Sequence, residues 1–264
     1  TKLPARSDRR SASRALPATW SGKSLSDPAP ARRRVLLKLS GEALSGEDGP
    51  FSPEILLRVA REIAEAVASE AVRVAVVIGG GNIFRGLAGG ASLGLARTTA
   101  DHMGMLATVM NALAMRDVLI AAGVRAEVHS AVAIGGVAGQ ISIPAVNAAL
   151  DAGRVVILAA GTGSPFFTTD TAAALRAAEI GADMLYKATK VDGVYSSDPV
   201  RDPDAVRFDH ISYPEVLERR LGVMDLTAIS FCMENRIPIC VFSMIGDGAI
   251  SKALRGESCG TTVS

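Results

Sequence analysis

The chain has 264 residues, of which 48% are hydrophobic, enough for a large core in one broad α/β domain or two small ones. Residues 1–34 hold nine of the 28 bases and two of the 27 acids, so residues 35–264 hold 19 bases and 25 acids, a net charge of −6. This acidic balance argues against a nucleic-acid-coating surface on the folded body.

The N-terminal segment, residues 1–33, is rich in Pro, Ser, Ala and Arg and has no sustained apolar period. We therefore expect a basic, disordered extension followed by one domain over residues 34–264. The Arg-rich, acid-poor composition also fits the remnant of a transit peptide, so a plastid stroma is an alternative to a cytoplasmic location. No apolar run reaches the roughly 18 residues of a membrane span, so we expect a soluble body.

Short β-branched runs alternate with helical patterns after residue 33. Strands are predicted over residues 34–40, 72–79, 124–130, 154–160, 182–188 and 237–243. Helices are predicted from residue 53 to the late 60s, from about 98 to 122, over 171–182 and over 226–236. Several strands are apolar on both faces, which indicates a mostly parallel sheet. The predicted fold class is α/β, a three-layer α/β/α sandwich around that sheet.

Three predicted strands end in loops that allow close backbone approach. "KLSG" ends the first strand, "GGGNIFRG" follows the second, and "GTGSPFFTTD" follows the fourth. Ligands of open α/β sheets bind beyond the carboxyl ends of the strands. Glycines there let backbone N–H groups converge on phosphate oxygens, and Lys38 and Arg85 add positive charge. The sequence therefore favours a polyphosphate ligand, on a scaffold without the Walker or dinucleotide fingerprint.

Cysteines and histidines give no metal-binding pattern. The three cysteines lack C-x-x-C spacing and nearby histidines, so we expect reduced thiols and no zinc site at Cys232, Cys240 and Cys259. The histidines are scattered along the chain, and we expect structural roles for His102, His129 and His210.

Six segments carry a resemblance to a known family: "VLLKLSGEAL", "VVIGGGNIFRG", "DHMGMLATVMNALAMRD", "AAGTGSPFFTTDTAAALRAAEI", "KATKVDGVYSSDP" and "VMDLTAIS". Together they resemble the bacterial-type uridylate kinases (UMP kinases) of the amino acid kinase superfamily, from about Arg34 to the C-terminus. The resemblance implies transfer of the γ-phosphoryl group of ATP to UMP, giving UDP for pyrimidine nucleotide biosynthesis, with Mg²⁺ and in a homohexamer. It also implies a cytoplasmic allosteric enzyme, with GTP activation and UTP inhibition left open.

The same resemblance implies roles for individual residues. ATP-binding positions are matched by Lys38, Leu39, Ser40, Gly41, Gly81, Arg85, Thr189, Tyr195 and Asp198. UMP-binding positions are matched by Gly80, Asp101, Thr162, Gly163, Ser164, Pro165, Phe166, Phe167, Thr168 and Thr169. Catalytic positions are matched by Lys38, Arg85, Asp170 and Lys187, with Asp170 organising the lysines. No protein ligand for the metal is implied.

Some of these residues have ordinary alternatives. Asp170 also suits a helix N-cap, a role compatible with holding lysines, and Asp101 suits a helix-capping acid. Tyr195 suits a packed surface aromatic. Ile120 and Glu127 lie where the family's GTP site carries basic side chains, which leaves GTP activation open.

Two other functions remain as alternatives to a UMP kinase. One is another amino acid kinase that acts on a carboxylate or carbamate, because the Lys38 loop is shared across the superfamily. The other is a non-catalytic regulator that senses UMP or UTP. The charges of Lys38, Arg85 and Asp170 argue against the regulator, because a sensor has no need for charge around a transferring phosphoryl group.

Overall fold

The structure, a computed structural model, describes residues 32–264 except 48, 70, 71, 86–89, 91, 200, 258 and 259. Residues 32–264 form one compact unit. The predicted disordered extension lies outside the described residues except for its last two, and so does Cys259. The boundary between extension and domain stays a prediction, although the first strand begins at Arg33.

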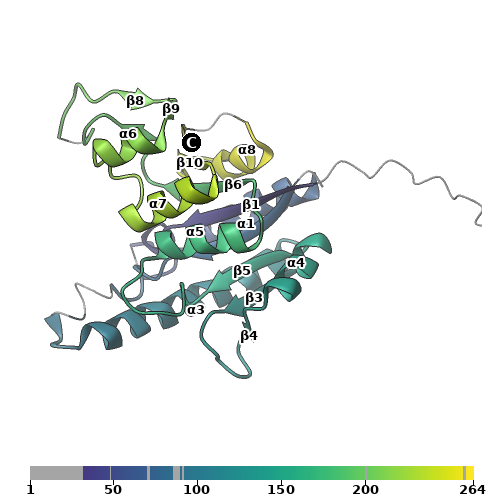
Figure 1. Ribbon diagram of the computed structural model, residues 1–264. Coiled ribbons are helices and arrows are strands. Elements are labelled where there is room, and N and C mark those ends of the chain that lie inside the picture. The colour runs from purple at the N-terminus through teal and green to yellow at the C-terminus, as the bar shows by residue number, and fades with distance from the viewer. Residues whose placement is uncertain are drawn as a thin grey trace, which may run out of the picture. The chain divides into compact units, whose positions relative to one another are not determined.

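A nine-stranded sheet in the order β4-β3-β5-β2-β1-β6-β10-β11-β9 forms the centre of this unit (Figure 1). Neighbouring strands are parallel except β10 and β11. The strands are β1 (Arg33–Leu39), β2 (Val72–Ile78), β3 (Ala126–Ser130), β4 (Gly139–Gln140), β5 (Val155–Ala159), β6 (Met184–Thr189), β9 (His210–Ile211), β10 (Ile239–Ser243) and β11 (Thr261–Val263). A separate antiparallel pair consists of β7 (Val194–Tyr195) and β8 (Arg207–Phe208).

Helices cover both faces of the sheet. One face packs against α1 (Pro53–Ala68), α3 (Arg97–Ala121) and α8 (Ala249–Arg255). The other packs against α4 (Ile143–Asp151), α5 (Thr169–Glu179), α6 (Tyr213–Glu218) and α7 (Leu226–Asn235), and α5 and α7 lie side by side (Figure 1). A short 3-10 helix, η1 (Gly41–Ala43), follows β1. The predicted three-layer α/β/α sandwich with a mostly parallel sheet is confirmed.

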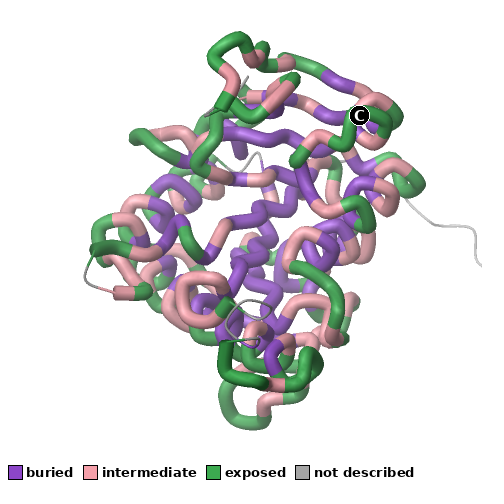
Figure 2. Tube along the Cα trace, turned by 90° about the vertical axis from the view of Figure 1, so that its left-hand side faces the viewer, coloured by how far each residue is buried: buried purple, intermediate pink, exposed green. Residues whose placement is uncertain are grey.

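Strand β1 shows how the core positions the site. Val35, Leu37 and Leu39 point to the face covered by α1 and α3, whereas Leu36 points to the face covered by α5, and all four are buried. In Figure 2 the buried residues, in purple, run through the centre of the unit. Because side chains alternate along a strand, Lys38 shares the α5 face with Leu36.

The predicted start of α1 is confirmed in detail. The hydroxyl of Ser52 accepts a hydrogen bond from the backbone N–H of Ile55, and Pro53 is the first helical residue. Such a cap satisfies a backbone donor that the helix itself leaves free. The apolar residues Leu56, Val59 and Ile63 then recur on the buried side of the helix.

Helix α3 is long and apolar enough to cross a membrane by length and composition, with a mean hydropathy of 1.4 over an 18-residue window. In this structure it packs against α1, β3 and β5, as a core helix does. One side of it stays open, where Met103, Leu106 and Met110 are 36%, 51% and 51% exposed.

Candidate active site

Two lysines lie side by side at the carboxyl ends of neighbouring strands. In the parallel register of β1 and β6, Lys38 pairs with Lys187. Asp170, the second residue of α5, lies between them: its Oδ1 is 2.7 Å from Lys38 Nζ, and its Oδ2 is 2.8 Å from Lys187 Nζ. All three side chains are at most 16% exposed. One carboxylate thus joins two ammonium groups in a largely buried cluster, which we call the Lys-Asp-Lys cluster.

The electrostatics keep this carboxylate ionised. Burial raises the pKa of Asp170, but the ammonium groups of Lys38 and Lys187 outweigh burial and hold that pKa below its ordinary value. Burial lowers the pKa of Lys187 from 10.5, the Asp170 carboxylate opposes this shift, and Lys38 adds to it. With both lysines protonated, the cluster carries one net positive charge, which suits an anionic ligand.

The turns after β1 and β2 approach each other closely. A Cβ added to Gly41 would lie 2.3 Å from the carbonyl oxygen of Gly79, so no larger residue fits there without a backbone shift. The buried amide of Asn111, on α3, donates to the same carbonyl at 2.6 Å. Arg85, beside these turns, is exposed and forms an ion pair with Glu42 at 2.9 Å.

A cavity of about 340 Å³ opens beside α3 and the β5–α5 loop, and we call it the acceptor cavity. The predicted site residues that line it are Gly80, Gly81, Arg85, Asp101, Thr162, Ser164, Phe167, Thr168 and Thr169. The lining also includes Arg97, a residue that the sequence patterns did not point to. The Arg97 Nε donates to both carboxylate oxygens of Asp101 at 2.9 Å, and Asp101 Oδ2 accepts the backbone N–H of Phe166 at 2.8 Å.

The β5–α5 loop has an unusual backbone that buried side chains hold in place. Ala160 and Phe166 have φ angles of 62° and 72°, in the left-handed region that residues other than glycine seldom adopt. The hydroxyl of Thr108 accepts the N–H of Ala160 at 2.8 Å. The buried Arg176 donates from Nη2 to the carbonyl oxygen of Gly161 at 3.3 Å. Two helices, α3 and α5, therefore fix the start of this loop.

A second cavity, of about 460 Å³, lies on the other side of Lys187, and we call it the donor cavity. The predicted residues that line it are Lys187, Thr189, Tyr195 and Asp198. The Tyr195 hydroxyl donates to Asp192 Oδ1 at 2.7 Å, and Arg207 Nη1 lies 3.2 Å from Asp192 Oδ2. Tyr195 therefore belongs to a polar rim rather than to the packed surface considered as its alternative.

The Lys-Asp-Lys cluster lies next to both cavities. Lys187 lines the donor cavity, whereas Thr169, directly before Asp170, lines the acceptor cavity. Lys38 and Asp170 line neither cavity and lie between them. The other predicted site residues outside both linings are Leu39, Ser40, Gly41, Gly163, Pro165 and Phe166.

Two sequence interpretations need correction. Helix α3 begins at Arg97 with Ala96 as its N-cap, so the alternative role of Asp101 as a helix-capping acid is wrong. The N-cap of α5 is Thr168, whose hydroxyl accepts from the N–H groups of Asp170 and Thr171. Asp170 is thus not the N-cap, and its carboxylate is directed to the lysines.

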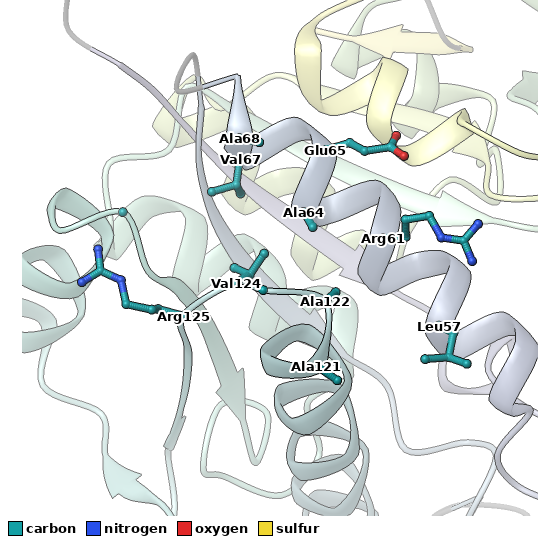
Figure 3. Close-up of a pocket in the computed structure, with 12 residues that line it drawn as sticks. Leu57, Arg61, Ala64, Glu65, Val67, Ala68, Ala121, Ala122, Val124 and Arg125 are labelled. Atoms are coloured by element: carbon teal, nitrogen blue, oxygen red, sulfur yellow. The ribbon is translucent and has the colours of Figure 1, made fainter.

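A larger cavity, of about 680 Å³, lies away from this cluster (Figure 3). It opens between the second half of α1 and the turn that leaves α3, with Val67 and Ala121 on opposite sides. Its charged lining residues are Arg61, Glu65 and Arg125, and none of the predicted site residues lines it. Size alone therefore does not locate the chemistry of this protein.

The sequence model of the amino acid kinase family matches residues 33–243. The chain belongs to the amino acid kinase family. It is 54% identical over 232 residues to a uridylate kinase from Magnetococcus marinus, a match that covers 88% of this chain and 95% of that relative. The predicted relationship to uridylate kinases is thereby confirmed.

Solved structures agree with this relationship. UMP kinase from Ureaplasma parvum superimposes with a TM-score of 0.83 at 36% identity, over 88% of this chain and 99% of that one. UMP kinase from Bacillus anthracis gives 0.84 at 34% identity, over 88% and 96% of the two chains. Uridylate kinase from Archaeoglobus fulgidus gives 0.67 at 31% identity, over 87% and 99%.

Proposed function

We propose that the chain catalyses ATP-dependent phosphorylation of UMP. In this reaction an oxygen of the UMP phosphate attacks the γ-phosphorus of ATP, the bond from that phosphorus to the β,γ-bridging oxygen breaks, and UDP and ADP form. The observation that carries the proposal is the Lys-Asp-Lys cluster between two cavities, because it lies where two nucleotides would bring their phosphates together. The 54% identity to a uridylate kinase supports UMP as the acceptor.

The roles proposed for the cluster follow from phosphoryl-transfer chemistry. A loose transition state spreads negative charge over the oxygens of the transferring group, so positioning and charge neutralisation matter more than covalent catalysis. Lys38 and Lys187 supply that charge, and Asp170 keeps both ammonium groups in place. Asp170 needs no role as a base, because its lowered pKa makes it a poor proton acceptor. Arg85 reaches the phosphates once it leaves Glu42.

The two nucleotides occupy the two cavities in this proposal. ATP places its adenosine against Thr189, Tyr195 and Asp198, and its phosphates against the turns that carry residues 38–41 and Gly81. UMP occupies the acceptor cavity, with Asp101 and residues 162–169 around its ribose, base and phosphate, and Gly80 below it. A Cβ on Gly80 would lie 2.7 Å from the carbonyl oxygen of Gly104, so this close packing against α3 requires glycine.

Mg²⁺ enters with ATP in this scheme. Among the described residues, no three His, Cys, Asp or Glu side chains gather closely enough to hold a metal ion. Mg²⁺ in kinase sites is held largely by substrate phosphates and water. The phosphates of ATP would thus supply its ligands, and the cation would neutralise their charge.

We also propose that the chain assembles into a homohexamer, as the resemblance implies. The open side of α3, with Met103, Leu106 and Met110, supports a contact between copies, because exposed apolar residues in a row on one helix favour burial against a partner. Sedimentation at micromolar concentration tests this assembly, and a monomer alone would reject it.

Regulation and location complete the proposal. UTP shares uracil and ribose with UMP, so we expect it to compete for the acceptor cavity. Glu127 forms an ion pair with Arg154 at 2.7 Å, and both line a surface cavity with Ile120. This pair neutralises Arg154 at that cavity, so GTP should change the rate little. A rate that rises severalfold with GTP would contradict this.

We place the enzyme in the cytoplasm, and import of a fluorescent protein fused to residues 1–33 into isolated plastids would select the stroma instead.

The decisive experiment is a coupled ADP-release assay with ATP, Mg²⁺ and a panel of acceptors. Uracil and cytosine differ in donors and acceptors at positions 3 and 4, so a site that pairs with uracil leaves buried groups unpaired with CMP. Such mismatches are worth about 10⁴-fold in kcat/KM. We expect strong preference for UMP over CMP, dTMP and AMP. Turnover only with aspartate, glutamate or carbamate would select another amino acid kinase, and UMP binding without turnover would select a regulator.

A further inference from the structure

The segment that enters α7 contacts the Lys-Asp-Lys cluster from the donor side. The carbonyl oxygen of Val223 accepts a hydrogen bond from Lys187 Nζ at 2.5 Å, and Val223 lines the donor cavity. Two residues later, Asp225 is the N-cap of α7, where its Oδ1 accepts the backbone N–H of Ala228 at 3.0 Å. In the sequence, this segment, within "VMDLTAIS", stood out only through its resemblance to the uridylate kinases.

The same Asp225 carboxylate reaches the first turn of α5. It accepts the hydroxyl of Thr168 in a short hydrogen bond through Oδ2, and the hydroxyl of Thr171 at 3.0 Å through both oxygens. Thr168 caps α5 and Thr171 is buried. One carboxylate therefore joins the N-terminal ends of two helices, where negative charge is favourable.

This contact continues to the Lys-Asp-Lys cluster. The Thr168 hydroxyl, which donates to Asp225, accepts the backbone N–H of Asp170 at 3.1 Å. The chain of contacts thus runs from Asp225 through Thr168 to the residue that holds both lysines. Thr168 also lines the acceptor cavity.

We propose that Asp225 is a positioning residue that fixes the start of α5, and with it the Asp170 carboxylate, to the donor-side segment that holds Lys187. The inference rests on the phosphoryl-transfer role proposed for the cluster. Asp225 itself lines neither nucleotide cavity and acts through Thr168, Thr171 and Asp170. Because Val223 and Asp225 lie on one short segment, a shift of that segment on the donor side moves the carboxylate on the acceptor side.

Asp225→Asn tests this role with little change of shape, because asparagine also caps helices well. The variant loses the charge and one of the two acceptor oxygens that the threonine hydroxyls share. Displacement of a catalytic group by about 1 Å can cost about 10²-fold. We expect kcat to fall about 10- to 100-fold, while the KM values for ATP and UMP stay within about threefold of wild type.

Thr171 gives a second, independent variant pair. Thr171→Val keeps the size of the side chain and removes the hydroxyl that donates to Asp225, whereas Thr171→Ser keeps the hydroxyl. We expect Thr171→Val to lower kcat and Thr171→Ser to restore most of it. If the two residues act together, Asp225→Asn combined with Thr171→Val costs less than the product of the single losses.

Ser52→Ala is the matched control, because it removes the N-cap of α1 on the opposite face of the sheet. It should lower the melting temperature and leave kcat unchanged. A kcat for Asp225→Asn within twofold of wild type would overturn the positioning role, as would Thr171→Ser failing to restore what Thr171→Val loses. Failure of the proposed function looks different, because wild-type protein would then form no UDP from UMP.

Discussion

The acceptor and donor cavities share the Lys-Asp-Lys cluster but are held in shape by different kinds of contact. Around the acceptor cavity, buried Thr108 and Arg176 hold the backbone of the β5–α5 loop. Around the donor cavity, Arg207 pairs with Asp192 and Arg201 with Asp198, and these side chains are 39% to 86% exposed. Exposed ion pairs contribute little to stability. We therefore expect the acceptor loop to be more strongly preorganised than the exposed rim of the donor cavity, which should adjust more when ATP binds.

This comparison explains where selectivity should reside. A buried polar group left without a partner costs about 1–3 kcal/mol, so a rigid, hydrogen-bonded pocket discriminates between similar ligands. A cavity with an exposed, adjustable rim discriminates less. We therefore expect the choice of base to be strict for the acceptor nucleotide and looser for the donor.

The largest expected effect comes from the cluster that both cavities share. Lys38→Ala removes one of the two ammonium groups that would neutralise the transferring phosphoryl group. Loss of one such electrostatic contact costs about 10³-fold in kcat, measured as ADP release with UMP. The control is Lys252→Ala, an exposed lysine in the last turn of α8. Near-normal turnover by Lys38→Ala would remove Lys38 from the mechanism.

The pH profile tests the second lysine. Burial lowers the pKa of Lys187 below 10.5, and Asp170 opposes that shift. Deprotonation removes positive charge, so kcat/KM should fall as pH rises through this lowered pKa. Asp170→Asn removes a group that raises the pKa of Lys187. The fall of kcat/KM at high pH, the basic limb of the profile, should therefore move to lower pH. Tyr195→Phe should leave the limb in place, which excludes the phenol as its source, and a limb that moves to higher pH in Asp170→Asn would contradict this account.

The family resemblance implied the residues of the cluster, and the contacts that hold them were not predicted. The strand pattern placed Lys38 at the end of an apolar strand, whereas Lys187 was assigned through the resemblance alone. Asp170 stands beside a predicted helix start. By contrast, Thr168 hydrogen-bonds Asp225, 57 residues away in the sequence, and Thr108 hydrogen-bonds Ala160, 52 residues away. No local sequence pattern predicts such long-range contacts.

The missed helices have a similar explanation. Helix α8 has seven residues and begins after Gly248 without a side-chain cap, and α4 begins at Ile143 without one. Helix α6, also missed, has only six residues even though the Ser212 hydroxyl caps it, so short length is what the missed helices share. Such short helices depend on packing against the sheet for their stability. The sequence pattern therefore predicted the layers and the long helices. It could not predict the short helices, because they form only through tertiary contacts.

The preorganised loop gives the next prediction. Thr108→Val keeps the shape of the side chain but leaves the buried N–H of Ala160 without its acceptor, at a cost of about 1–3 kcal/mol in the free energy of unfolding. Because Ala160 begins the loop of the acceptor cavity, the KM for UMP should rise about tenfold while the KM for ATP changes little. Thr108→Ser should recover the wild-type free energy of unfolding and the wild-type KM for UMP. Thr98→Val, at an exposed site on α3, is the control. Equal rises in both KM values would contradict the comparison.

The smallest effect is expected at the rim of the donor cavity. Tyr195→Phe removes the hydroxyl that donates to Asp192 at 2.7 Å and leaves the aromatic ring in place. Asp192 keeps Arg207 as a partner, and water can replace the lost donor at this exposed rim. The KM for ATP should therefore rise no more than about threefold, with the KM for UMP and the melting temperature unchanged. If Tyr195→Phe instead raised the KM for ATP as much as Thr108→Val raises that for UMP, the donor rim would be as strongly preorganised as the acceptor loop, and exposure would be a poor guide to rigidity in this fold.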